Sequence, residues 1–361
     1  MDFKDIYRHG TYNLIGSILR HYGLAGGEPL PVIDHYLTKN YRNVFILLMD
    51  GLSVKLVRTS EFLSRHLADE IYSVFPSTTT ASLTTLYSGL SPIEHGWMGW
   101  NVYLPELPYD GVTLLLNTVM NSDQPAADYH VGHELLGYRS IFDRISQTGT
   151  HVLHTSPFTD TGARSVDHLL NHLYEHAQRP GRNFGFGYWT EPDYTQHQHG
   201  AMSPQALKVV RDLEESLKIW RELLSDTLLI VMSDHGMIDS TPVYLSDYPE
   251  LYDLLRREIS FEPRNPSFFI KDGQREKFSD KFRELLPDFD LYTHEQVLAS
   301  GMYGPGTPHP STEHSIGDFV AVARGTRRLH HDRAKAVDFI GVHAGLTREE
   351  MMVPLIIFEC P

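Results

Sequence analysis

The chain has 361 residues, which suits about two domains of ~150 residues or one large α/β domain with insertions. It carries 31 Lys and Arg against 46 Asp and Glu, a formal charge of −15, and no basic run suited to a nucleic-acid backbone. A single cysteine, Cys360, excludes a disulfide framework, a cysteine-based zinc site and a sulfatase with a cysteine-derived nucleophile. Without an apolar signal segment or a run of ~18 apolar residues, we expect a cytoplasmic protein with no membrane partner.

Short apolar runs alternate with longer amphipathic stretches along the chain, which is typical of βα units around a mostly parallel sheet. The runs predicted as strands are residues 43–49, 151–154, 183–189, 227–232, 318–322 and 353–358. The stretches predicted as helices are residues 79–89, 139–147, 165–178 and 203–224. The predicted fold class is α/β, with helices on both faces of a mostly parallel central sheet.

Residues 246–312 have a different pattern, with charged amphipathic pieces, an isolated strand at 267–270 and a Gly/Pro-rich loop at 301–308. We predict a small inserted α+β cap here, on a core formed by residues 1–245 and 313–361. Residues 105–128 contain several Pro, Asp and Asn residues, which predicts a loop. This loop is either a lid or a simple surface loop.

Three predicted strands end in Asp or His side chains, at the edge where open α/β sheets collect ligands. These side chains are Asp50, Asp193 with His197, and Asp234 with His235. Asp193 and His197 are four residues apart, so a helical turn places them on one face, and Gly236 supplies permissive backbone for a turn at the last pair. Taken alone, Asp50 would more often be only a helix N-cap. Together, carboxylates and imidazoles that lack basic partners predict two divalent cations.

A Ser/Thr-rich run, Phe75-Pro-Ser-Thr-Thr-Thr-Ala-Ser82, leads into the predicted helix 79–89. One of its hydroxyls is expected to cap the helix. The same position is the positive end of the helix dipole, where an alkoxide or a phosphate oxygen is stabilised. A threonine oxygen bound to a metal there would be an activated nucleophile.

In chain order the motifs are a strand ending in Asp, Phe-Pro-Ser-Thr-Thr-Thr with a following Gly-Leu-Ser-Pro-Ile-Glu-His-Gly, Glu-Pro-Asp-x3-His, Ser-Asp-His-Gly-Met, and a late Val-His-Ala-Gly-Leu. With them, the sequence from about residue 43 to 357 resembles the alkaline phosphatase superfamily. It looks most like the type I phosphodiesterase and nucleotide pyrophosphatase family. The resemblance implies an alkaline-phosphatase-like, metal-dependent hydrolase core that acts on a small phosphate ester substrate.

The family pattern, carried onto this sequence, implies two divalent ions, most simply Zn²⁺, although Asp/His sites also accept manganese or iron. One ion would be held by Asp50, Asp234 and His235 with the nucleophile oxygen. The other would be held by Asp193, His197 and a late histidine, for which His343 is the match and His314 a rival. Ala344 follows His343 where the family usually has Gly, so the local turn is expected to differ.

The family's nucleophile lies ten residues before the helix-ending Gly89, which implies Thr79 as the catalytic residue and as a metal ligand. A covalent phosphothreonine intermediate would follow. Relatives that cleave diesters carry Asn three residues later, and Ser82 is expected to bind the phosphoryl oxygen in its place.

We expect diesters to be cleaved faster than monoesters, because the motif segments lack the Lys or Arg that a dianion requires. Arg264 or Arg275 of the cap could still reach the substrate. Trp97, Trp100 and Tyr103 are either a flat surface for the leaving group or ordinary packing. The alternatives are a phosphomonoesterase, a phosphonate hydrolase, or a catalytically silent metal-binding module.

Overall fold

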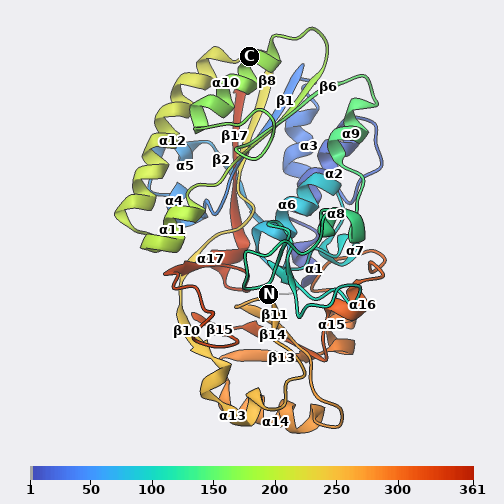
Figure 1. Cartoon of the computed structure of the whole chain (residues 1–361). Coiled ribbons are helices and arrows are strands. Elements are labelled where there is room, and N and C mark those ends of the chain that lie inside the picture. The colour runs from blue at the N-terminus through green and yellow to red at the C-terminus, as the bar shows by residue number, and fades with distance from the viewer. Residues whose placement is uncertain (1–2) are drawn as a thin grey trace.

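The computed structural model describes residues 3–361, which form two lobes, each built on a sheet (Figure 1). The main sheet has six strands in the order β2-β17-β8-β1-β7-β6. They are β1 (Asn43–Met49), β2 (Leu67–Tyr72), β6 (His151–Thr155), β7 (Asn183–Trp189), β8 (Thr227–Met232) and β17 (Met352–Cys360). The strands β6, β7, β1 and β8 are parallel, whereas β17 runs antiparallel between β8 and β2. The α/β class with a mostly parallel central sheet is thus confirmed.

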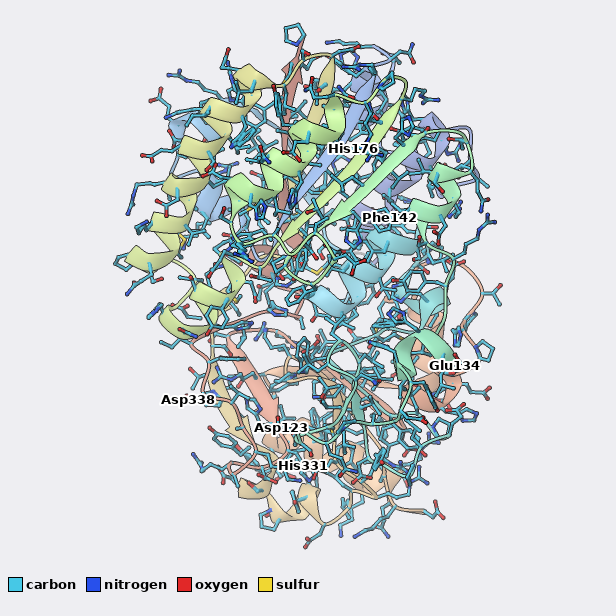
Figure 2. The ribbon with its side chains drawn as sticks, turned by 45° about the horizontal axis from the view of Figure 1, so that its top comes forward. Asp123, Glu134, Phe142, His176, His331 and Asp338 are labelled. Carbon is cyan, nitrogen blue, oxygen red and sulfur yellow. The ribbon has the colours of Figure 1, made fainter. Side chains whose placement is uncertain are left out.

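Helices cover both faces of the main sheet, because its central strand is apolar on both sides. Val44, Ile46 and Leu48 of β1 face one helical layer, and the alternate residues face the other. The first layer contains α2 (Thr11–His21), α3 (Pro31–Leu37), α6 (Thr79–Ser88) and α9 (Ile141–Ser146). The second contains α4 (Val54–Val57), α5 (Glu61–Arg65), α10 (Val166–Ala177) and α12 (Pro204–Leu223). Figure 2 shows Phe142 and His176 in this lobe and Asp123 and His331 in the other.

The second sheet has seven strands in the order β13-β14-β12-β11-β3-β4-β5. They are β3 (Asn101–Val102), β4 (Val112–Thr113), β5 (Thr118–Val119), β11 (Ser260–Glu262), β12 (Asn265–Phe268), β13 (Phe289–Thr293) and β14 (Phe319–Ala323). The run at 318–322, grouped with the main-sheet strands by sequence, lies here and pairs antiparallel with β12 and β13. That assignment was wrong because a strand buried on both faces has the same apolar pattern in either sheet.

The second sheet takes strands from outside the predicted cap. Only β11, β12 and β13 lie within residues 246–312, while β14 follows that segment and β3, β4 and β5 precede it. Two helices, α13 (Pro249–Tyr252) and α14 (Arg275–Leu285), pack on the sheet through apolar residues such as Phe278 and Phe282. The domain boundary itself stays a prediction.

The remaining elements are short. They are α1 (Phe3–Ile6), α7 (Pro92–His95), α8 (Val131–Leu135), α11 (Asp193–His199), α15 (His294–Ser300), α16 (Thr312–Ser315), α17 (Arg348–Met351) and a 3-10 turn at Leu245–Asp247. Two small sheets pair β9 (Ile238–Asp239) with β16 (Gly341–Val342), and β10 (Thr241–Tyr244) with β15 (Arg327–His330). Within residues 3–361, no helix combines the length and apolar character needed to cross a membrane.

Candidate metal centre

The candidate site lies at the carboxyl ends of the three central parallel strands. Asp50 directly follows β1, α11 begins at Asp193 shortly after β7, and Asp234 and His235 follow β8. Because these strands are parallel and adjacent, their ends meet at one edge of the sheet. The loop after β16 adds His343 from the C-terminal part of the chain.

The first group of possible ligands consists of Asp50, Asp234 and His235, which are all buried. Each offers a ligand atom, and these atoms lie within 4.8 Å of one another. The Nε2 atom of His235 is 3.3 Å from Oδ1 of Asp50 and 3.6 Å from Oδ2 of Asp234. This is the trio that the family pattern implied for one ion.

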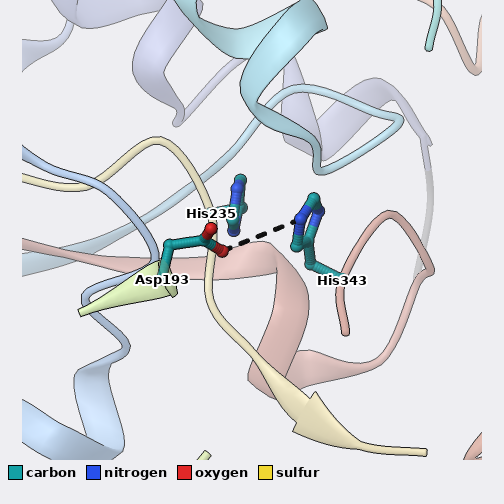
Figure 3. A group of neighbouring side chains, drawn as sticks. All are labelled: Asp193, His235 and His343. Carbon is teal, nitrogen blue, oxygen red and sulfur yellow. Dashed lines mark ion pairs between the residues drawn. The ribbon is translucent and has the colours of Figure 1, made fainter. Parts of the chain in front are cut away.

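The second group consists of Asp193, His235 and His343, drawn in Figure 3, and its ligand atoms also lie within 4.8 Å of one another. Nε2 of His343 is 3.8 Å from Oδ1 of Asp193, and Nε2 of His197 is 3.2 Å from Oδ2 of the same carboxylate. The rival His314 lies exposed in α16, away from this group. The structure therefore brings together all six predicted side-chain ligands, with Asp193 between two histidines.

Each histidine of the site is oriented by a backbone carbonyl. Nδ1 lies 3.0 Å from the Gly236 oxygen in His235, 2.8 Å from the Gly341 oxygen in His197, and 3.1 Å from the Ser77 oxygen in His343. A carbonyl accepts a hydrogen bond, so Nδ1 carries the proton and the lone pair of Nε2 faces the site. This arrangement is typical of imidazoles that bind a metal ion.

The carboxylates of the site are incompletely partnered for buried groups. Burial, and then the charges of Asp234 and Asp193, raise the pKa of Asp50 well above its usual value. Burial also disfavours the charged form of Asp193, but its contact with the His197 imidazole and the other nearby imidazoles lower its pKa to about 2. Oδ1 of Asp193 and Oδ2 of Asp234 are buried without a hydrogen-bond partner. Divalent cations would bind both oxygens and would offset the repulsion between the neighbouring carboxylates. The residues therefore fit a metal centre.

The three adjacent threonines have different environments at the start of α6. Oγ1 of Thr79 is 3.1 Å from Nε2 of His235 and 3.5 Å from Oδ1 of Asp50. The Thr78 hydroxyl donates to Glu262 over 2.7 Å, and the Thr80 hydroxyl is buried without a partner. Thr78 occupies the N-cap position, but no side-chain capping bond forms, so the expectation of a hydroxyl cap was wrong. Of the three, Thr79 faces the candidate ligands.

Ser82 is buried one turn further along α6. Its hydroxyl donates to the carbonyl oxygen of Asp234 over 2.9 Å and lies 3.0 Å from the Ser73 hydroxyl. In this position it supports the backbone of a candidate ligand. Its predicted contact with a phosphoryl oxygen stays a prediction.

Two polar residues of the site have no motif in the sequence. The Tyr188 hydroxyl donates to Oδ2 of Asp50 from β7, whose residues between Asn183 and Tyr188 are apolar. Glu262 reaches the start of α6 from β11, and its carboxylate oxygen accepts the Thr78 hydroxyl and the backbone N–H of Trp100. Burial raises the pKa of Glu262 to about 7, although these two hydrogen bonds and the nearby imidazoles oppose the shift. Neither residue belongs to one of the Asp- and His-containing motifs to which the sequence directed attention.

The cap arginines considered as substrate ligands are engaged elsewhere. Arg264 is fully buried and its guanidinium binds both carboxylate oxygens of Glu350. Arg275 forms an ion pair of 2.9 Å with Asp318 at the surface. Both guanidinium groups thus already have a carboxylate partner, and the suggestion that one of them reaches the substrate stays a prediction.

The aromatic residues after α6 do not act as one surface. Trp97 is buried in the core between the sheets, where its indole N–H donates to the Leu136 carbonyl. Tyr103 packs against Phe269 and under the guanidinium of Arg257. Trp100 is the most exposed of the three, at 36%. Packing thus explains Trp97 and Tyr103, and Trp100 remains available to a ligand.

Two turns beside the ligands differ from expectation in their backbone. Ala344 has φ +83°, a left-handed conformation typical of glycine, so the turn after His343 keeps this geometry despite its side chain. Gly236 does not have a positive φ. A Cβ atom at this position would lie 1.9 Å from the Glu349 carbonyl oxygen, so close packing requires the glycine.

The fold is alkaline-phosphatase-like, and the site gathers two groups of candidate metal ligands. The family model for Type I phosphodiesterase / nucleotide pyrophosphatase matches residues 44–345, and the chain belongs to this family. Its members hydrolyse phosphoric ester bonds. Human ectonucleotide pyrophosphatase/phosphodiesterase family member 7 is 32% identical over 120 residues, which are 30% of this chain and 26% of that protein.

Two solved structures are similar over most of the chain. Murine ectonucleotide pyrophosphatase / phosphodiesterase 5 gives a TM-score of 0.67 at 18% identity, covering 86% of this chain and 87% of that one. Phosphonoacetate hydrolase from Sinorhizobium meliloti, in complex with phosphonoformate, gives 0.66 at 17% identity, covering 88% and 90%. At these identities the likeness supports the fold.

Proposed function

We propose that this protein hydrolyses phosphodiesters or nucleotide pyrophosphate bonds with Thr79 as its nucleophile. The observation that carries the proposal is the position of the Thr79 hydroxyl, 3.1 Å from His235 and 3.5 Å from Asp50 at the start of α6. Asp50, Asp234 and His235 would hold one divalent ion, and Asp193, His197 and His343 a second. When bound, such ions supply Lewis acidity to the attacking and departing oxygens, and zinc suits these ligands.

The chain's own residues would carry the reaction in two displacements. Oγ1 of Thr79 attacks phosphorus and forms a phosphothreonine, the bond from phosphorus to the first alcohol or phosphate group breaks, and the departing oxygen takes up the proton that Thr79 loses. Water then attacks phosphorus, the bond between phosphorus and Oγ1 breaks, and Oγ1 takes up a proton that the attacking water loses. The free backbone N–H groups at the start of α6 stabilise the negative charge of the phosphoryl oxygens.

The charge of the site supports diesters over monoesters. A monoester dianion brings one more negative charge, which enzymes normally meet with an extra cation. Here Arg264 is paired with Glu350 and Arg275 with Asp318, so neither is free to provide it. We expect kcat/KM for bis(p-nitrophenyl) phosphate to exceed that for p-nitrophenyl phosphate on zinc-loaded protein. A ratio below one would overturn the diester preference.

Substitution of two of the three adjacent threonines tests the nucleophile. Thr79→Ala should abolish turnover while two ions per chain remain bound, whereas Thr80→Ala should be much milder. Loss of activity in Thr80→Ala with an active Thr79→Ala would show that the assignment is one residue off. The likeness to phosphonoacetate hydrolase makes phosphonate hydrolysis the second candidate. It is favoured if phosphonoacetate is turned over faster than any diester.

A further inference from the structure

Glu262 joins the second sheet to the start of the nucleophile helix. It lies at the end of β11, is 7% exposed, and is separated from Thr78 by 184 residues of sequence. One carboxylate oxygen, Oε1, accepts the Thr78 hydroxyl and the Trp100 backbone N–H, each over 2.7 Å. A single atom therefore connects α6, the segment after α7 and β11.

The backbone around Glu262 is shaped to reach this position. Phe261, immediately before it, has φ +67°, a left-handed conformation that costs a bulky residue on the order of 1–3 kcal/mol. Phe261 pairs with Asn101 across the sheet, and a Cβ atom on Gly99 would lie 2.8 Å from the Phe261 Cα. The close approach of these two segments brings the Trp100 N–H to Glu262. The strained backbone at Phe261 and the tight packing at Gly99 thus both position the Glu262 side chain.

The Thr78 hydroxyl is the group that Glu262 controls. An N-cap threonine ordinarily turns its oxygen to the free N–H groups of its own helix, which here include those beside Thr79. In this chain the hydroxyl donates to Glu262 and makes no capping bond. The N–H groups at the helix start therefore stay free for a substrate oxygen, and Thr79 faces the ligand residues.

We propose that Glu262 is a positioning residue, which holds Thr78 away from the start of α6 and thereby fixes Thr79 for attack. This inference rests on the proposed role of Thr79 as the nucleophile. Glu262 acts through Thr78 and Trp100, and its carboxylate oxygen is required as a hydrogen-bond acceptor. A misplaced reacting group costs about 100-fold in rate per ångström, so loss of the acceptor should lower kcat rather than raise KM.

Four variants assayed with bis(p-nitrophenyl) phosphate at saturating zinc test the proposal. Glu262→Ala should lower kcat by about 10- to 100-fold, with KM and metal content near the wild-type values. Glu262→Gln keeps an oxygen acceptor and should restore kcat to within about threefold of the wild type. Thr78→Val should lower kcat by about tenfold, and the double variant Glu262→Ala/Thr78→Val should be no slower than Glu262→Ala.

Thr113→Val is the matched control. Thr113 is a buried threonine of the same sheet, and its hydroxyl donates to Asn101 rather than to α6. It should keep the wild-type kcat, which separates the role of Glu262 from a general loosening of the second sheet. Thr78→Val keeps the buried carboxylate, so it tests the proposal even where Glu262→Ala folds poorly.

Three results would overturn the inference. They are a Glu262→Ala kcat within twofold of the wild type, a Glu262→Gln variant as slow as Glu262→Ala, and additive losses in the double variant. Thr79→Ala is assayed in the same series. If Thr79→Ala is inactive and Glu262→Ala is unimpaired, only the role of Glu262 fails. If Thr79→Ala retains wild-type turnover, the proposed nucleophile fails, and the role of Glu262 with it.

Discussion

The buried ion pair between Arg264 and Glu350 should be a major support of the metal centre. Both side chains are fully buried, and the Glu350 carboxylate also accepts the Gly345 N–H over 2.8 Å and the Thr347 hydroxyl over 2.6 Å. Gly345 lies two residues after His343, and its carbonyl accepts the Ser77 hydroxyl. The pair therefore links the second sheet to the loop that carries a candidate ligand.

Arg264→Met would leave the Glu350 carboxylate buried without its cation. Breaking such a pair costs about 3–5 kcal/mol. With about 2.1 cal/mol/K of unfolding entropy per residue over 361 residues, Tm should fall by about 4–7 °C if the chain unfolds as one unit. Differential scanning calorimetry at a fixed zinc concentration measures the change.

A double variant and a surface control make this test specific. Arg264→Met/Glu350→Gln removes both charges and should be more stable than Arg264→Met alone, because no unpaired charge remains buried. Arg348→Met breaks an exposed ion pair with Glu70 and should change stability by less than about 1 kcal/mol. A wild-type Tm in Arg264→Met, or a double variant less stable than the single one, would refute the reasoning.

Two further predictions concern backbone strain and pH. Ala344→Gly should keep full activity and raise the free energy of unfolding by up to about 1 kcal/mol, because glycine adopts φ +83° without strain; a less stable variant would contradict this. The pKa of Glu262 rises on folding from 4.5 to about 7, so the folded chain binds more protons between these values and loses about 3 kcal/mol of stability as pH rises through them. Glu262→Gln lacks this loss, so its Tm relative to the wild type should be higher at pH 8 than at pH 5; parallel Tm curves would contradict the assignment.

The sequence predicted best the parts of the fold that depend on local pattern. The strands at 43–49, 183–189 and 227–232 have the predicted bounds, because a central parallel strand is apolar on both faces and ends at a polar residue. Placing the run at 318–322 in its sheet required long-range pairing, which apolar composition does not encode. The two-residue strands β3, β4 and β5 are too short to give a periodic signal.

The same distinction holds for the site. The six candidate ligands were found because strand-end Asp residues and closely spaced His residues form ordered motifs, and the structure places them together. Glu262 and Tyr188 were missed because each is a single polar residue whose partner is distant in sequence. Arg264 was considered as a substrate ligand because the sequence shows its charge. The sequence does not show that Glu350, 86 residues later, pairs with it.

The metal content of the purified protein tests the central claim most directly. Elemental analysis should find close to two divalent ions per chain, and a strong chelator should remove both the ions and diester hydrolysis, which added zinc then restores. Undiminished hydrolysis of bis(p-nitrophenyl) phosphate by metal-free protein would contradict the account.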